Sequence, residues 1–279
     1  MIDKSSNLTL YDHLSSSFCV QVRIALREKG IPFNSIIPSG LGTGQDRDPS
    51  WSSANVRTQV PTLLDDGGAT QVFDSTIIIE YLEDKFGRSL LPETPAERAK
   101  ARQIEDVVQT TYEAINWGWA EVVWGKRGSE ELQQKIKREA RRQVKVVHEW
   151  LTEQLGSQPY FNGNTFGWAD VAVAPMVHRG VIYGDGMEPA TNSPLAQWHA
   201  RIMERSAVKQ TLDEMEKGAK AMGDSYTTVF APGRGNKREY GSHRLEFMLK
   251  AGGMSVVEEG LKEGTIRFGW PEGKSGDDV

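Results

Sequence analysis

The chain has 279 residues, of which 38% are apolar and 25% are charged, and its formal net charge at neutral pH is −5. This length is enough to bury two cores of ordinary size, so we expect at least two domains. Basic and acidic residues are mixed along the whole sequence, which excludes the concentrated positive surface that nucleic acids and anionic membranes require.

A single cysteine, Cys19, excludes an internal disulfide framework and a zinc site built from several thiolates. The five histidines show no metal-binding spacing, so we expect no metal. The first ten residues, MIDKSSNLTL, lack the pattern of a signal peptide, and no apolar run approaches the length of a membrane span. We therefore expect a reducing, cytoplasmic location.

The first 87 residues alternate between strand and helix patterns. Apolar residues alternate with polar ones in the expected strands and recur at helical spacing in the expected helices, and the sequence DDGG supplies a hairpin turn. In chain order we expect a strand, a helix, a strand, a β-hairpin and a helix, at residues 7–11, 18–29, 33–37, 62–73 and 75–86. This order is typical of an α/β domain with a thioredoxin-like fold, which we place at residues 1–87.

A proline-containing linker at residues 88–96 leads into a region, residues 97–225, whose pattern is helical almost throughout. We expect an all-α substrate domain there, a helical bundle. Its helices are expected at residues 97–124, 130–156, 168–179, 195–204 and 207–217. Residues 226–279 form a C-terminal extension, with a short helix expected at residues 243–251.

The stretch SSSFCVQVRIAL, residues 15–26, places three hydroxyls and the only thiol at the start of the first helix. In a thioredoxin-like domain this helix N-terminus favours a negatively charged sulfur, because free N–H groups and the helix dipole point at it. A disulfide-exchanging enzyme has its reactive cysteine at the first position of C-x-x-C; here that position is Ser16, and Cys19 takes the fourth. Ser16 can instead donate a hydrogen bond to a thiolate that a ligand brings. Two other interpretations stay open. Ser16 or Ser17 could simply cap the helix, and Cys19 could be a small buried apolar side chain.

Two further segments can bind the backbone and the charge of a ligand. In NVRTQVPTL, residues 55–63, a cis bond before Pro61 would expose the N–H and C=O of Val60 to an extended peptide. A trans proline at a sheet edge is the alternative. Ser75, as the N-cap of the helix at 75–86, would offer free amide groups to a carboxylate, as any capped helix would.

Taken together, these stretches resemble the cytosolic glutathione transferases of the serine type. SSFCVQVRIALREKGIPF is similar to S-P-F-x-x-R-V-x-I-A-L-x-E-K-G-I, NVRTQVPTL to N-P-x-G-x-V-P-x-L, and FDSTIIIEYLEDKF to E-S-x-x-I-x-x-Y-L. In the helical half, FNGNTFGWADVAVAP is similar to G-x-x-x-T-x-A-D, and LAQWHARIMERSAVKQTL to W-x-x-x-(I/M)-x-x-R-P-A-V-K. The resemblance covers residues 7–217 in the family's order and is nearest to the β-etherase-like, tau and zeta branches.

The resemblance implies a thioredoxin-like domain that binds glutathione as co-substrate, a helical domain that lines a hydrophobic substrate site, and a homodimer. It implies that Ser16 stabilises the glutathione thiolate and that Pro61 is cis. The glutathione-binding residues that it implies are Ser17, Phe18, Gln59, Val60, Pro61, Asp74 and Ser75. For the glycine carboxylate of glutathione, Arg47 and Arg57 are the candidates.

Four departures from the family pattern mark a divergent class. Ser17 replaces the proline of S-P-F, and Gln21 replaces the arginine of the R-V pair. Asp74 is one methylene shorter than the usual glutamate, and Gly167 replaces the hydroxyl residue three positions before Asp170.

The substrate side is expected on the helix at residues 97–124, which lines the electrophile site in the family. The expected pocket residues are Val107, Thr110, Thr111, Tyr112 and Trp119. Aromatic side chains at helical spacing, here also Trp117 and Trp124, are equally typical of a core. The extension has its own aromatic residues, Phe230, Tyr240, Phe247, Phe268 and Trp270. They predict that it packs over the helical domain, either as a lid on the site or as a buttress on a distant face.

Three chemistries of the family fit such a site. They are conjugation of glutathione to a hydrophobic, aromatic electrophile, glutathione-dependent cleavage of β-aryl ethers, and zeta-type cis–trans isomerisation of small diacids. An isomerase would need cationic residues for its diacid, and the aromatic residues of the helix at 97–124 argue against such a site. The sequence therefore favours an enzyme of the first two kinds. A non-catalytic glutathione-binding protein is the alternative from another class.

Overall fold

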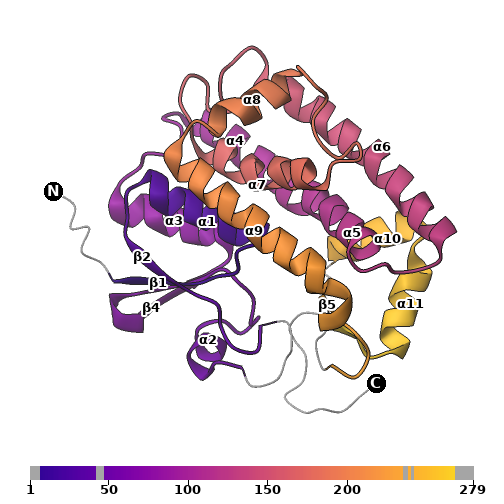
Figure 1. Ribbon diagram of the computed structural model, residues 1–279. Coiled ribbons are helices and arrows are strands. Elements are labelled where there is room, and N and C mark those ends of the chain that lie inside the picture. The colour runs from indigo at the N-terminus through magenta and orange to yellow at the C-terminus, as the bar shows by residue number, and fades with distance from the viewer. Residues whose placement is uncertain (1–6, 42–46, 235–237, 240–241, 268–279) are drawn as a thin grey trace.

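The computed structural model describes residues 7–41, 47–234, 238–239 and 242–267 (Figure 1). A four-stranded sheet with helices packed on it forms the N-terminal part, and helices form almost all of the described remainder. The predicted combination of a thioredoxin-like α/β domain and an α-helical bundle is confirmed.

The N-terminal part follows the predicted order of elements. Its strands are β1 (Leu8–Tyr11), β2 (Phe33–Ile36), β3 (Thr62–Asp65) and β4 (Thr70–Phe73), and its helices are α1 (Ser17–Glu28), α2 (Pro49–Ala54) and α3 (Ser75–Phe86). The strand order is β2-β1-β3-β4, with β2 parallel to β1 and the other pairs antiparallel. A short turn, η1 (Asp66–Gly68), closes the β3–β4 hairpin as predicted.

Helix α2 is not among the elements expected from the sequence. Asp48 caps it by accepting the N–H of Ser50 at 2.8 Å, and Pro49 occupies the first helical position. A helix of six residues is too short for apolar periodicity to reveal it, so only the cap indicates it.

The remaining elements form the helical part and its C-terminal addition. The helices are α4 (Pro95–Val107), α5 (Glu113–Val123), α6 (Glu130–Leu155), α7 (Trp168–Tyr183), α8 (Pro194–Ile202), α9 (Ser206–Val229), α10 (Ser242–Lys250) and α11 (Met254–Lys262). Two short strands, β5 (Arg238–Glu239) and β6 (Ile266–Arg267), pair in parallel.

Two helices differ from their predicted extents. The predicted helix at 97–124 contains a π-helical turn, η2 (Val108–Tyr112), in which the N–H of Glu113 bonds to the carbonyl of Val108. Helix α9, predicted to end at residue 217, continues to Val229. The expected start of the C-terminal extension at residue 226 therefore lies inside α9.

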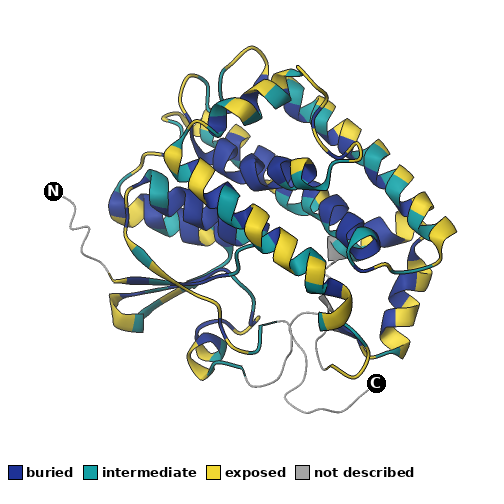
Figure 2. Cartoon of the chain, in the orientation of Figure 1, coloured by how far each residue is buried: buried dark blue, intermediate teal, exposed yellow. Residues whose placement is uncertain are grey.

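Helix α1 joins the two parts of the molecule. It packs against α3 of the N-terminal part and against α7 and α9 of the bundle, and Figure 2 shows α1 and α7 as largely buried. Two ion pairs cross the same boundary, Arg27 with Glu214 at 2.8 Å and Arg205 with Glu28 at 2.5 Å.

Two of the departures from the family pattern have a structural reason. Gln21 is fully buried, donates to the carbonyl of Ala172 at 3.2 Å and accepts from the amide of Gln109 at 2.8 Å. Gly167 has no room for a side chain, because an added Cβ would lie 2.3 Å from the amide nitrogen of Asn162. Asp170 still caps α7 by accepting the N–H of Gly167 at 3.0 Å.

The C-terminal extension packs on the helical part through α10, as predicted. The ring of Phe247 lies so close to Gly118 on α5 that an added Cβ there would be 2.3 Å from it. Of the other aromatic residues expected to anchor the extension, Phe230 packs against Tyr226, with 4.9 Å between the ring centres, whereas Tyr240, Phe268 and Trp270 lie outside the described residues.

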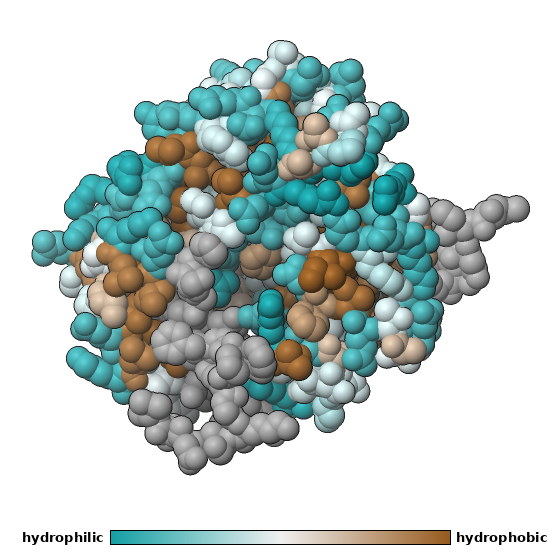
Figure 3. Space-filling view, turned by 180° about the vertical axis from the view of Figure 1, so that it is seen from behind, coloured by the Kyte–Doolittle hydropathy of each residue, from teal (hydrophilic) through white to brown (hydrophobic). Residues whose placement is uncertain are grey.

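The surface is mostly hydrophilic, and Figure 3 shows apolar groups gathered in separate patches on the face seen from behind. Within the described part of the chain, no helix combines the length and the apolar composition needed to cross a bilayer.

Candidate active site

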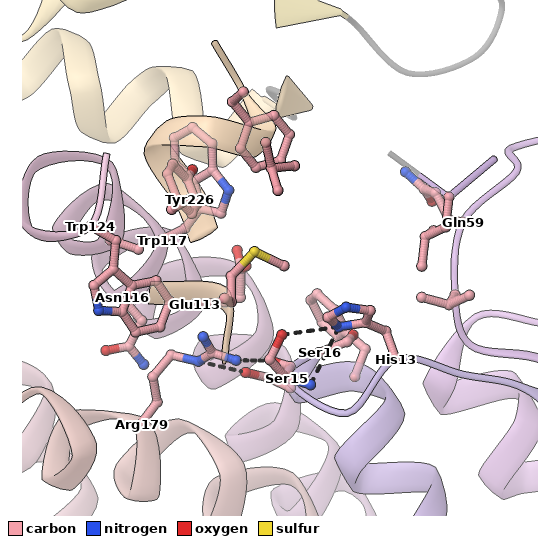
Figure 4. Close-up of a pocket in the computed structure, with 18 of the residues that line it drawn as sticks. His13, Ser15, Ser16, Gln59, Glu113, Asn116, Trp117, Trp124, Arg179 and Tyr226 are labelled. Carbon is pink, nitrogen blue, oxygen red and sulfur yellow. Dashed lines mark hydrogen bonds between the residues drawn. The ribbon is translucent and has the colours of Figure 1, made fainter. Parts of the chain in front are cut away.

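A cavity of about 580 Å³ opens between the N-terminal part and the helical part. Residues from the N-terminal part form one wall, and α5, α7, the end of α9 and α10 form the other (Figure 4). The predicted residues Ser16, Ser17, Phe18, Gln59 and Val60 all line it.

Ser16 is the N-cap of α1 and lies at the base of this cavity. Its Oγ accepts the N–H of Cys19 at 3.4 Å. Because a hydroxyl both accepts and donates, this cap leaves the hydroxyl hydrogen of Ser16 able to bond to a ligand. The two roles that the sequence left open for Ser16, cap and donor, are therefore compatible.

Cys19 does not line the cavity and is fully buried. Burial raises the pKa of its thiol, which disfavours the thiolate that a nucleophile needs. The prediction that Cys19 is a small buried side chain is confirmed.

The residues on either side of Ser16 are held from both parts of the molecule. Ser15 Oγ lies 3.0 Å from His13 Nδ1, and burial lowers the pKa of His13. Arg179 on α7 donates through Nη2 to the carbonyl oxygen of Ser15, and through Nε to Ser17 Oγ at 3.2 Å. Sequence reasoning missed Arg179, because a charged residue within a mostly apolar helix gives no sign of which loop it reaches.

The Val60–Pro61 bond is cis, as predicted. The preceding carbonyl, that of Gln59, accepts from Asn55 Nδ2 at 3.0 Å and from Trp51 Nε1 at 3.1 Å. These bonds fix the loop that carries Gln59 across the cavity from Trp117 and Trp124 (Figure 4).

At the start of α3, the structure corrects one detail. Asp74, not Ser75, is the N-cap, since its Oδ1 accepts the N–H of Thr76 at 3.0 Å. Asp74 has a φ of 79°, a conformation that a residue other than glycine seldom adopts. Ser75 follows as a buried first helical residue, and its Oγ lies 3.4 Å from Gln109 Nε2.

Four predicted glutathione-site residues lie outside the lining of the cavity: Arg47, Pro61, Asp74 and Ser75. Arg47 precedes α2, and Pro61 is buried. Arg57 is the other candidate for the glycine carboxylate. Its guanidinium carbon lies 5.6 Å from the centre of the Phe73 ring.

The helical wall of the cavity uses a different face of the first long helix from the predicted one. None of the predicted residues Val107, Thr110, Thr111, Tyr112 and Trp119 lines the cavity, and the lining residues of α5 are Glu113, Asn116, Trp117 and Ala120. Tyr112 and Trp119 face α6 instead. Tyr112 bonds to His148 at 2.6 Å, and the guanidinium carbon of Arg141 lies 5.6 Å from the Trp119 ring.

The end of α9 and the helix α10 supply the rest of the helical wall. Tyr226, Val229, Phe230 and Arg244 line the cavity there. Arg244 pairs with Glu113 at 3.1 Å, and its guanidinium carbon lies 5.1 Å from the ring of Trp117. The segment beyond residue 225 therefore reaches the candidate site. The sequence alone allows two positions for this segment, as a lid on the site or as a buttress on a distant face.

A buried polar cluster lies behind the start of α3. Glu105 accepts from Thr76 Oγ1 at 2.7 Å and from Trp168 Nε1 at 2.6 Å. Burial raises the pKa of Glu105 to about 7. The amide of Gln109 connects this carboxyl to Ser75. Among the described residues, no group of three or more His, Cys, Asp or Glu side chains is placed to hold a metal ion.

Comparison with known proteins identifies two family domains in the chain. Residues 10–92 match the family described as glutathione S-transferase, N-terminal domain, and residues 134–201 match glutathione S-transferase, C-terminal domain. Glutathione S-transferase U28 of Arabidopsis thaliana is 29% identical over 226 residues, which are 77% of this chain and 92% of that protein. Glutathione S-transferase U22 of the same plant is 30% identical over 220 residues, 76% of this chain and 93% of the relative.

Solved structures with the same arrangement include the β-etherase LigF from Sphingobium sp. strain SYK-6. It is 25% identical, superposes with a TM-score of 0.60, and matches 75% of this chain and 99% of its own.

Proposed function

This chain belongs to the glutathione S-transferase family, and on that premise we propose that it activates the thiol of glutathione for attack on a hydrophobic, aromatic electrophile. The observation that carries the proposal is the position of Ser16. Its hydroxyl caps α1 at the base of a cavity that Gln59 and Val60 line on one side and Trp117 on the other.

The proposed role of Ser16 is to stabilise the thiolate of bound glutathione. A hydrogen bond to the charged form and the positive end of α1 both favour an anionic sulfur. Lowering a thiol pKa from about 8.5 to about 6.5 corresponds to about 2.7 kcal/mol, and it raises the thiolate fraction at neutral pH from a few per cent to about three quarters.

In the proposed reaction the sulfur forms a bond to an electrophilic carbon. The leaving group departs with the electron pair of the bond that breaks, and the thiol proton has already passed to solvent. The protein contributes the thiolate and the proximity of the two reactants, which the aromatic walls hold together.

The rest of glutathione is proposed to extend from Ser16 across the N-terminal part. The backbone of Val60 would pair with its cysteinyl residue, and Asp74 and Ser75 at the start of α3 would hold the γ-glutamyl end. Arg47 stays a proposal for the glycine carboxylate.

Cleavage of a β-aryl ether is the first specific reaction that we consider. In that reaction the same thiolate attacks the carbon that bears the aryl ether, and a phenolate leaves. The similarity to the solved structure of a β-etherase supports it, as does an aromatic cavity wall. The zeta-type isomerisation gains support from Arg179 and Arg244 in the lining, although Arg244 is already paired with Glu113. Product analysis with a β-aryl ether and with a cis-diacid would decide between them.

The proposal is tested by titrating the ultraviolet absorbance of the thiolate of bound glutathione, in the natural protein and in Ser16→Ala. We expect a lowered thiol pKa in the natural protein and a rise of about one to two units in the variant. If glutathione binds with the pKa of the free thiol in both proteins, the chain is a non-catalytic glutathione-binding protein instead.

A homodimer and a cytoplasmic location stay predictions. Sedimentation at several protein concentrations would test the first, and fractionation of the source cells would test the second.

A further inference from the structure

Arg179 reaches from the helical part to the segment that presents Ser16. Its side chain leaves α7, and its two bonds end on Ser15 and Ser17, the neighbours of Ser16 on either side. Figure 4 shows the guanidinium beside Ser15, and Arg179 also lines the cavity. A guanidinium carries five N–H donors, so these two bonds leave others for a ligand.

Arg179 differs from two other arginines at this boundary in its lack of a counter-ion among the described residues. Arg27 pairs with Glu214, and Arg205 pairs with Glu28. Within the described residues, no carboxylate forms an ion pair with Arg179. A partly buried cation without a counter-ion is unfavourable, so a site of this kind favours an anion.

The other titratable groups around Arg179 do not supply that anion. Burial lowers the pKa of His13 and raises the pKa of Tyr183, so both are neutral at neutral pH. Glu113 on α5 is paired with Arg244. Asp12, behind the loop, is paired at 3.1 Å with the buried Arg23.

We propose that Arg179 is a positioning residue of the proposed reaction, which holds the Ser15–Ser17 segment and supplies, from the helical part, the positive charge opposite the glutathione thiolate. This inference rests on the proposed function, because that function places an anionic sulfur beside Ser16. The two anchoring bonds flank Ser16 directly, which favours the thiolate over an anionic group elsewhere on the electrophile. With the thiolate bound, the charge of Arg179 is balanced.

The test compares Arg179→Gln, which removes the charge, with Arg179→Lys, which keeps it. The thiol pKa of bound glutathione is measured by thiolate absorbance, together with kcat and KM for 1-chloro-2,4-dinitrobenzene, a neutral electrophile. We expect Arg179→Gln to raise the thiol pKa by about one unit, which lowers the thiolate fraction about tenfold at a pH below both values. Arg179→Lys should restore most of the lost ionisation, and the KM for the electrophile should stay unchanged.

Arg27→Gln is the matched control for a purely structural effect. It also removes a guanidinium that ties α1 to the bundle, through Thr211 and Glu214, but it lies at the opposite end of α1. We expect a lower melting temperature with an unchanged thiol pKa. Arg179→Met, which keeps the apolar stem of the side chain, replaces the glutamine variant if that variant does not fold.

Two results would overturn the inference. One is a thiol pKa that Arg179→Gln leaves unchanged while Ser16→Ala raises it; the proposed function then stands without Arg179. The other is a KM that rises only for a carboxylate-bearing electrophile such as 4-chloro-3-nitrobenzoate, which would assign the cation to the substrate. If the natural protein itself shows no lowered thiol pKa, the proposed function fails first.

Discussion

The two walls of the cavity are built in different ways. In the wall from the N-terminal part, Ser16 is fixed by the N–H of Cys19 and the Gln59 carbonyl by Asn55, both a few positions away, although Ser15 and Ser17 also bond to the distant Arg179. In the wall from the helical part, the partners are distant in sequence, and Arg244 lies 131 residues after Glu113. Local geometry therefore specifies most of the wall proposed for glutathione, with Arg179 as a long-range contact, whereas tertiary packing specifies the wall proposed for the electrophile.

The largest expected effect separates two tryptophans of α5 that the sequence cannot distinguish. Trp119 is 1% exposed and faces α6, so Trp119→Ala should lower the free energy of unfolding by about 3–5 kcal/mol. It should leave the KM for the electrophile near that of the natural protein. Trp117→Ala should do the reverse, raising that KM about tenfold with little loss of stability. Urea unfolding and steady-state kinetics on both variants check this pair. A large change of KM in Trp119→Ala alone would show that Trp119 lines the substrate pocket, as the sequence predicts.

The next effect tests whether α10 belongs to the electrophile wall. Phe247→Ala removes the ring that packs on Gly118, which should destabilise α10 locally by about 3 kcal/mol. Because Arg244 lies on the same helix, kcat/KM for the electrophile should change while the KM for glutathione does not. Hydrogen exchange of α10 and steady-state kinetics measure the two effects. The control is Leu249→Ala, at an exposed position of α10; unchanged electrophile kinetics in Phe247→Ala would leave α10 as a buttress only.

The smallest effect concerns Glu105, which accepts hydrogen bonds from Thr76 on α3 and from Trp168 on α7. Its pKa is raised from 4.5 to about 7 by burial, so the folded state favours the protonated carboxyl. The stability that this contributes is fully present below about pH 4.5, and it is lost as the pH rises toward 7. Glu105→Gln should therefore gain stability relative to the natural protein between these pH values, by at most about 3 kcal/mol. Urea unfolding at several pH values checks it, with the exposed neighbour Asp106→Asn as control. A difference that does not vary with pH would contradict the assignment.

The sequence predicts well the features that are settled within a few residues. The order of strands and helices in the N-terminal part, the capping position of Ser16, the cis bond before Pro61 and the burial of Cys19 all depend on short-range geometry or on a motif of contiguous residues. The family resemblance adds to these because its motifs are contiguous as well.

The features that the sequence does not predict depend on contacts between distant segments or on a local irregularity. The π-helical turn at Val108–Tyr112 adds a residue to one turn, which rotates the following helix by about 100° relative to a regular one. The expected residues Val107, Thr110 and Thr111 lie before or within this turn, and the part of the predicted helix that lines the cavity follows it, with Trp117 and not Trp119 in the lining. The contacts of Arg179 cannot be predicted from the sequence, because its partners Ser15 and Ser17 lie more than 160 positions away.

The central claim is that a sulfur brought by glutathione reacts while the protein's own sulfur stays idle. Its most direct test is to measure glutathione conjugation by Ser16→Ala and Cys19→Ala side by side at neutral pH. We expect kcat/KM to fall by about threefold to twenty-fivefold in Ser16→Ala, which is the loss of thiolate fraction for a thiol pKa raised by about one to two, and to stay within about twofold in Cys19→Ala. Full activity in Ser16→Ala together with none in a folded Cys19→Ala would reverse the two roles and contradict the account.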